Sequence, residues 1–228
     1  MTVLQNVHVE VSGLLFDMDG VLMSSLGSVE RSWRKFAELR GVDPALAVQI
    51  AHGKRALDTV RHLLPHADAE AELRVIERIE VEDTDGISLL PGVLHLLRSL
   101  PADAWTIVTS ATTRLAESRL AYVGITPPAR FITSEMVAHG KPHPEPYLRG
   151  AELLGLAPQD CLVIEDAPAG VASGKAAGCS VLAVLTTHAP ETLTAADWRI
   201  STLADLRLEA VRTTAQGRKL GFSLTTTP

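Results

Sequence analysis

Cysteine is scarce in this sequence, and long apolar runs are missing from it. The two cysteines, Cys161 and Cys179, sit in short apolar segments, which argues against a disulfide framework or a Cys-based zinc site. A membrane-spanning helix needs about 20 consecutive apolar residues, and no stretch approaches that length. The start of the chain holds polar groups and an acid where a signal peptide would carry a basic end and a long apolar stretch. These absences predict a soluble, cytoplasmic protein with no membrane partner.

A strongly basic region is also missing. The formal net charge is -6, and residues 31–40 form the one short basic cluster. Proteins that bind nucleic acids carry a basic patch or stripe, so this composition argues against a nucleic-acid partner, and we expect residues 31–40 to be a solvated helix face. With 228 residues the chain exceeds a typical single domain but is short for two, which favours one core with an inserted or appended subdomain. The oligomeric state is left open by these features.

Four short apolar runs predict strands that are buried on both faces of a sheet. Each run is too short for a helix and does not alternate with polar residues, which is typical of parallel sheets. The predicted strands are residues 13–16, 105–110, 161–164 and 180–185. Predicted helices lie at residues 93–100, 113–123, 145–154 and 169–177. Strands that alternate with helices indicate a doubly wound α/β fold with a parallel sheet. Past residue 206 the pattern weakens, and residues 225–228 predict a frayed end.

The strand signal stops between residues 24 and 88. Amphipathic helices are predicted there at residues 29–40, 56–64 and 69–82. We therefore expect two domains: an α/β core made of residues 1–23 and 89–228, and an inserted α-helical domain made of residues 24–88.

Polar residues follow the predicted strands, where the ligand crevice of a parallel sheet lies. Asp17 and Asp19 come directly after the first strand, and Gly20 lets the chain turn sharply away. Two carboxylates one residue apart can bind a hard cation. Taken alone, the pair is explained equally well by an aspartate-rich turn or a helix cap.

Three further positions change the balance between those interpretations. Ser110 ends the second strand and offers a hydroxyl, Lys141 stands in a loop stiffened by prolines, and Glu165 with Asp166 adds carboxylate oxygens after the third strand. Each has an ordinary alternative: an N-cap, a surface lysine and an acidic helix start. Their convergence on one edge of the sheet favours a site for an anionic substrate and a cation.

These segments resemble the four motifs of haloacid dehalogenase superfamily phosphatases in order and spacing. They are Phe16-Asp17-Met18-Asp19-Gly20, Thr109-Ser110, Lys141-Pro142, and Glu165-Asp166 with the residues up to Gly170. The insertion falls where the subfamily that includes β-phosphoglucomutase carries a helical cap. Residues 51–55, 140–147 and 165–178 look closer to the sugar-phosphate and glycerol-phosphate phosphatases of that subfamily. Ser24 departs from the aspartate that many relatives have there.

The resemblance implies a mechanism and a role for each motif residue. Asp17 would be the nucleophile that forms an aspartyl phosphate, and Asp19 would be the acid and base and would give its backbone carbonyl to Mg²⁺. Asp17 and Asp166 would supply carboxylates to the metal, with Glu165 either beside them or one layer further out. Ser110 and Lys141 would hold the phosphoryl oxygens.

The inserted helices would form a lid over the crevice. Their loop contains His52, Gly53, Lys54 and Arg55, which suit binding of a sugar or polyol phosphate, although a basic turn between helices explains them too. The expected partner is thus a small-molecule phosphate ester.

Three other functions remain to be weighed. A phosphosugar mutase would share the catalytic residues, but mutase relatives have an arginine three residues after the loop glycine, where this chain has Ala56. A dehalogenase would need neither Asp19 nor Mg²⁺. A catalytically silent sensor of phosphometabolites keeps the fold without the chemistry, yet both aspartates are retained here.

Overall fold

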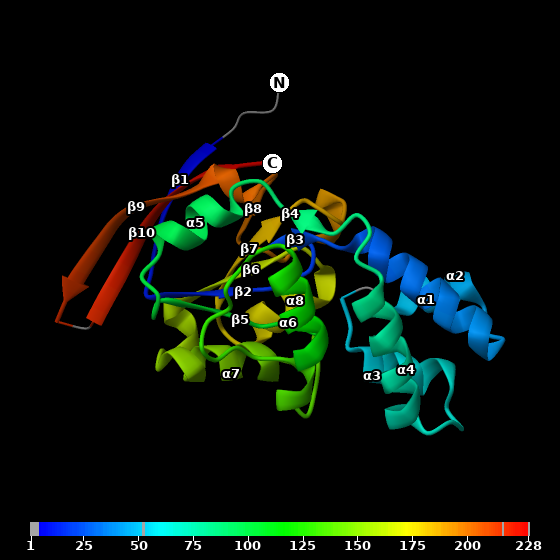
Figure 1. Cartoon of the computed structure of the whole chain (residues 1–228). Helices are drawn as coiled ribbons and strands as arrows, with labels where there is room; N and C mark the ends of the chain where they lie inside the picture. The colour runs from blue at the N-terminus through cyan, green and yellow to red at the C-terminus, as the bar shows by residue number, and fades with distance from the viewer. Residues whose placement is uncertain (1–4, 52, 216, 228) are drawn as a thin grey trace.

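A five-stranded parallel sheet forms the centre of the fold (Figure 1). The computed structural model describes residues 5–51, 53–215 and 217–227. In spatial order the strands are β5 (Trp105–Ile107), β2 (Gly13–Phe16), β6 (Cys161–Glu165), β7 (Ser180–Val184) and β8 (Trp198–Ile200). Helices cover both faces, so the predicted doubly wound α/β fold is confirmed.

Apolar and polar residues do not alternate along these strands, because both faces of the sheet are buried. Leu14 and Phe16 of β2 point to one face and pack with α5 (Val93–Ser99) and α6 (Thr113–Tyr122). Leu15 points to the other face, toward α7 (Glu145–Leu154) and α8 (Pro168–Ala176). Cys161 and Cys179 are buried and free, as the composition predicted.

The inserted segment forms a separate group of helices beside the sheet (Figure 1). They are α1 (Leu26–Arg40), α2 (Pro44–Ala51), α3 (Ala56–Leu63) and α4 (Ala69–Glu82). Trp33, Phe36 and Ile76 lie in their shared apolar core. The sequence did not predict α2, because its short, almost wholly apolar segment has no helical period to detect.

A small antiparallel ribbon joins the helical insertion to the sheet. It pairs β3 (Met23–Ser24) with β4 (Ser88–Leu89), with Met23 opposite Leu89 and Ser24 opposite Ser88. Both chain crossings between the two parts thus lie side by side. The expected domain boundaries, after residues 23 and 88, fall inside this ribbon and remain a proposal.

Two strands lie from residue 206 onward, where the sequence pattern weakens, and the frayed end expected at residues 225–228 was wrong for residues 225 and 226. β9 (Leu206–Thr214) and β10 (Gly217–Thr226) form a hairpin, and β10 pairs along its length with β1 (Gln5–Val11). Leu220, Phe222 and Leu224 alternate with exposed or half-buried residues and reach the main core. The partner strand lies at the opposite end of the chain, where a local pattern cannot reveal it. Within the described ranges, no helix is long and apolar enough to span a membrane.

Candidate active site

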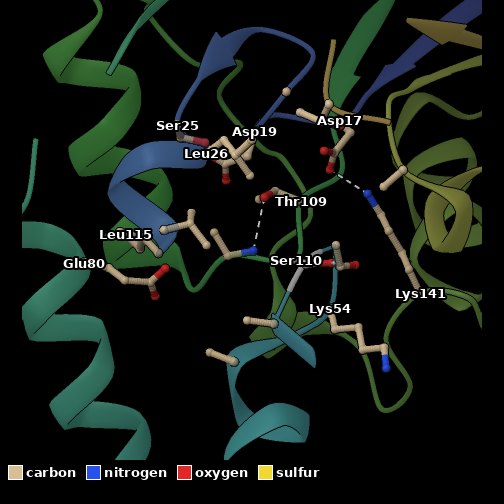
Figure 2. Close-up of a pocket in the computed structure, with 18 of the residues that line it drawn as sticks. Asp17, Asp19, Ser25, Leu26, Lys54, Glu80, Thr109, Ser110, Leu115 and Lys141 are labelled. Atoms are coloured by element: carbon tan, nitrogen blue, oxygen red, sulfur yellow. Dashed lines mark hydrogen bonds and ion pairs between the residues drawn. The ribbon is translucent and has the colours of Figure 1, made fainter. Parts of the chain in front are cut away.

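A cavity lies between the carboxyl ends of the parallel strands and the inserted helices (Figure 2). The loop after β2 contributes Asp17 and Asp19, and the loop after β5 contributes Ser110. Lys141 enters from the segment before α7, and Lys54 comes from the loop between α2 and α3. The fold therefore brings the four polar segments singled out in the sequence to one place.

The side chain of Lys141 links two of the carboxylates. Its buried Nζ donates hydrogen bonds to Asp17 Oδ1 at 2.6 Å, to Glu165 Oε1 at 2.7 Å and to the Val108 carbonyl at 3.0 Å. An ammonium has three protons, so all of them are used. The ammonium group is held at a fixed point against Asp17.

Both carboxylate oxygens of Glu165 also accept hydrogen bonds from other protein donors. Tyr147 donates its hydroxyl to Glu165 Oε1 at 2.7 Å, and the backbone N–H groups of Asp166 and Ala167 donate to Oε2. Glu165 is 1% exposed, so these bonds replace the water that an ionised carboxylate requires. This carboxylate serves to fix Lys141 and the start of α8.

Burial dominates the ionisation of this cluster. It raises the pKa of Asp17 to about 7, against the opposing effect of Lys141, and the nearby Glu165 adds to the rise. Burial, with Glu165 and Asp17 as neighbours, raises the pKa of Asp166 well above its usual range. Burial alone would lower the pKa of Lys141, but the charges of Asp17 and Glu165 raise it above its ordinary value. When all three carboxylates are ionised, they carry more negative charge than the one ammonium offsets.

This donor set fits a hard divalent cation. One oxygen each from Asp17, Glu165 and Asp166 lies within 4.8 Å of the others. Carboxylate oxygens are the preferred protein ligands of such ions, and a cation would offset the charge that burial makes costly. Because the oxygens of Glu165 are already engaged, Asp17 and Asp166 are the more available pair.

The approach of Asp166 to the first loop explains Gly20. Gly20 has a φ of 81°, and a side chain there would collide with the Asp166 carboxylate. Asp166 also accepts a short hydrogen bond from the Thr187 hydroxyl, which follows β7. A glycine is required here both for the turn and for the contact between the two loops.

Asp19 faces a different partner from Asp17. Both of its carboxylate oxygens accept hydrogen bonds from Arg119 Nη1, each at 3.0 Å. Arg119 lies on α6 and is 3% exposed, and its Nη2 reaches Glu80 Oε1 of α4 at 3.4 Å. Asp19 is therefore connected, through one buried guanidinium, to the inserted helices.

Ser110 lies at the junction of the sheet and the inserted helices. Its hydroxyl donates a long hydrogen bond of 3.5 Å to the Gly53 carbonyl. The neighbouring Thr109 is turned inward and accepts from the Ala111 N–H at 3.1 Å. Ser110, and not Thr109, thus has the hydroxyl that is free to rotate toward a bound anion.

The loop predicted to bind substrate divides into different roles. Gly53 and Lys54 line the cavity, whereas Arg55 does not. The guanidinium of Arg55 is engaged by the Asp58 carboxylate and by the Val137 carbonyl of the core, at 2.7 and 3.0 Å. This arrangement indicates that Arg55 bridges the inserted helices and the core. His52 lies outside the described residues.

Comparison with known proteins identifies the family. The family model for haloacid dehalogenase-like hydrolases matches residues 11–178. The chain belongs to this family. Hexitol phosphatase A from Escherichia coli (strain K12) is 48% identical over 177 residues, which cover 75% of this chain and 82% of that protein. Glycerol-1-phosphate phosphohydrolase 2 from Saccharomyces cerevisiae is 36% identical over 193 residues, which cover 79% of this chain and 77% of that protein.

Solved structures support the fold of this haloacid dehalogenase-like hydrolase. A β-phosphoglucomutase from Clostridium difficile superposes with a TM-score of 0.73 at 23% identity, and the match covers 86% of this chain and 93% of that chain. At that identity the likeness carries the fold alone. The resemblance inferred from the sequence motifs is thereby confirmed.

Sequence reasoning missed several residues of this hydrolase's site. Arg119, Tyr147 and Thr187 each contact a motif residue, and Glu80 contacts Arg119, yet each of the four lies in an ordinary helix or loop pattern. Tyr147 stands in a segment that was singled out, but nothing in the sequence says that its hydroxyl meets Glu165. Only the packing of α4, α6 and α7 around the sheet shows these contacts.

A second group with metal-binding atoms lies on the surface. It consists of His139, His143 and Glu145, around the loop that carries Lys141. The Glu145 carboxylate accepts from the backbone N–H groups of Ala138 and His139 at 3.0 and 2.9 Å. Those bonds give Glu145 a structural role at the start of α7.

Proposed function

We propose that this hydrolase cleaves a sugar or polyol phosphate with Mg²⁺ and through an aspartyl phosphate on Asp17. It is a phosphatase, as its family and its relatives, named as phosphatases, indicate. The observation that carries the finer proposal is the buried bond between Lys141 and Asp17 beside Asp166. This bond holds one carboxylate at the carboxyl end of the sheet, where it faces the cavity.

In the first half of the reaction, a carboxylate oxygen of Asp17 attacks phosphorus and the bond to the leaving oxygen breaks. Asp17 Oδ1 is held by Lys141, while Oδ2 accepts no hydrogen bond from the described residues and is the candidate nucleophile. Asp19 donates its proton to the leaving alkoxide, because an alkoxide is too basic to depart unprotonated.

In the second half, a water attacks phosphorus and Asp19 takes its proton. The bond between phosphorus and Asp17 breaks, which releases inorganic phosphate and restores the carboxylate. Lys141 and the Ser110 hydroxyl stabilise the phosphoryl charge in both halves. The inserted helices limit the entry of other water molecules.

Asp17 and Asp166, with the Asp19 backbone carbonyl, would hold the metal ion. When bound, Mg²⁺ offsets the repulsion between an anionic nucleophile and an anionic ester. It also favours the ionised form of Asp17, whose pKa burial raises to about 7 in its absence. Glu165 keeps Lys141 in place and lies outside the coordination shell in this proposal.

A phosphosugar mutase is the main alternative. A mutase must bind the second phosphate of its bisphosphate intermediate with the inserted helices while the intermediate reorients in the site. Ala56, three residues after Gly53, lines the cavity where an arginine would be expected, and Arg55 is committed to Asp58. Both observations favour hydrolysis.

The test is phosphate release from a panel of sugar, polyol and other small phosphate esters, with and without Mg²⁺. Wild type is compared with Asp17→Asn, which keeps the size and removes the nucleophilic charge. We expect Mg²⁺-dependent release that Asp17→Asn abolishes, and a covalent phosphate on the Asp17 peptide after acid quenching. Sugar isomerisation without phosphate release would favour the mutase, and no reaction with any ester would favour a silent sensor.

A further inference from the structure

Glu80 lies at the end of the cavity away from Lys141 (Figure 2). It forms a buried ion pair with Arg119, which also lines the cavity. The Glu80 side chain is 6% exposed and that of Arg119 is 3% exposed. The pair joins α4 of the inserted helices to α6 of the core. Neither residue takes part in the chemistry proposed above, so their burial beside the cavity needs another explanation.

The position of Asp19 places the leaving group next to this pair. A general acid must lie within hydrogen-bond reach of the oxygen that it protonates. Arg119 Nη1 is 3.0 Å from both carboxylate oxygens of Asp19. Arg119 and Glu80 line the same cavity as Asp19, so a carbon chain attached to the leaving oxygen has room beside this pair.

The chemistry of this end of the cavity suits neutral hydroxyl groups. Glu80 and Glu77 line it with carboxylate oxygens that accept hydrogen bonds. Arg119 has a buried Nε–H with no partner among the described residues, and a hydroxyl oxygen is a suitable acceptor. Trp33 and Leu115 supply apolar surface for the carbon chain. Hydroxyls both donate and accept, so a polyol matches the donors and acceptors of this wall.

The same wall opposes a second anionic group. Glu80 and Asp19 share one arginine, and the partners of Glu77 among the described residues are Thr112 and the largely exposed Arg114. A distal phosphate or carboxylate would meet two carboxylates in a buried, low-dielectric place, where like charges repel strongly.

We propose that Glu80 and Arg119 form the subsite that selects the leaving group, accepting neutral polyhydroxy chains and rejecting those with a second negative charge. This inference rests on the proposed phosphatase function and narrows its substrate class to uncharged polyol or sugar monophosphates. In this proposal Glu80 hydrogen-bonds a substrate hydroxyl. Arg119 holds the side chains of Glu80 and Asp19 in position beside the carbon chain of the substrate.

The experiment compares kcat/KM for three compounds: a hexitol phosphate, n-hexyl phosphate of the same chain length, and a hexitol bisphosphate. The variant is Glu80→Gln, which is isosteric and leaves Arg119 paired with Asp19. Glu70→Gln, on the exposed face of the same helix, is the matched control. Ratios between substrates are measured on one preparation, so they do not depend on the fraction of folded protein.

In wild type we expect a preference for the hexitol phosphate over both other compounds. Glu80→Gln should reduce the preference over n-hexyl phosphate about tenfold or more, the size expected when a hydrogen bond to a charged group is lost. Glu80→Gln should also lower the ratio of kcat/KM for the hexitol phosphate to kcat/KM for the bisphosphate. Glu70→Gln should change neither this ratio nor the ratio to n-hexyl phosphate. Ratios in Glu80→Gln that stay within about twofold of wild type would overturn the subsite.

Failure of the phosphatase itself would be seen separately, as absence of turnover by wild type with every compound. Binding of the three compounds to Asp17→Asn and to Asp17→Asn with Glu80→Gln, followed by calorimetry, repeats the comparison without turnover. Equal affinities in the two variants would count against the subsite whether or not the reaction occurs.

Discussion

At the scale of single residues, two glycines allow the carboxylates to pack closely. Gly20 makes room for Asp166, and Gly170, in the first turn of α8, makes room for Glu165. A side chain at residue 170 would overlap the whole Glu165 carboxylate. Because Glu165 binds Lys141, the position of Lys141 depends on residue 170 having no side chain.

Gly170→Ala is expected to displace Glu165 and to loosen Lys141 from Asp17. We predict a drop in kcat/KM of tenfold or more and a loss of about 2 kcal/mol in unfolding free energy, as expected for overpacking. The measurements are steady-state kinetics and urea unfolding. Gly27→Ala on α1 is the control, because it meets only the flexible end of Arg31 and should be neutral or slightly stabilising. Wild-type kinetics in Gly170→Ala would show that Glu165 does not position Lys141.

Protons should compete with Mg²⁺ at this site. Burial raises the pKa of Asp17 to about 7 in the metal-free protein and raises that of Asp166 as well. A metal ligand must be ionised, so affinity is full above the raised pKa and falls as the pH drops below it. Titration calorimetry should give a dissociation constant for Mg²⁺ about tenfold weaker at pH 6 than at pH 8, the ratio for one competing proton. Asp166→Asn should weaken binding at both pH values. A constant that does not change with pH would contradict this view of Asp17.

At the scale of secondary-structure elements, the strand β10 links the two ends of the chain. It pairs with β1 on one side and β9 on the other, and its buried residues join the core beneath α5. These three strands form a sheet of their own, whereas the site lies at the carboxyl ends of the five-stranded sheet, so β10 contributes stability and no chemistry.

Phe222→Ala should destabilise the protein without changing the site. Phe222 is 1% exposed, and truncating a buried phenylalanine costs about 3–5 kcal/mol. The urea midpoint should fall accordingly, while kcat/KM of the folded fraction stays near wild type. Val211→Ala on the adjacent strand, 49% exposed, should cost less than about 0.5 kcal/mol. An equally small effect for Phe222→Ala would mean that the hairpin does not belong to the cooperative core.

At the scale of the whole molecule, the inserted helices meet the core through a few polar contacts over the cavity. Thr112 donates to Glu77 at 2.6 Å, Arg55 to the Val137 carbonyl, and Arg119 to Glu80. The connection to the sheet is the short ribbon of β3 and β4. Polar contacts of this kind, together with a narrow connection, are typical of a part that opens and closes around a ligand.

Binding of a phosphate analogue should therefore slow hydrogen exchange in the inserted helices. With Mg²⁺ and a beryllofluoride or vanadate, we expect protection of amides in α3, α4 and the residue 53–55 loop. The β9–β10 hairpin, far from the cavity, should exchange at its original rate and is the internal control. Mass spectrometry of peptides would resolve the two regions. Protection spread evenly over the chain would contradict a local closure.

The sequence by itself determined four of the five strands of the parallel sheet, all except β8, and the grouping of the motif residues. Parallel strands buried on both faces give short apolar runs, and such runs predicted β2 within its observed bounds. Strong amphipathic periods likewise predicted α4 and α7 residue for residue. Since polar residues after such strands must meet at one edge, Asp17, Ser110, Lys141 and Asp166 could be grouped before their positions were known.

The tertiary structure alone decided which side chains meet across elements. The pairing of β1 with β10 joins opposite ends of the chain, and the bonds from Arg119 to Asp19 and Glu80 span 100 and 39 residues. Arg55, which the sequence suggested as a substrate contact, is drawn to Asp58 and to a core carbonyl. These contacts depend on how whole helices pack, and helix packing leaves no signature in the local pattern of one element.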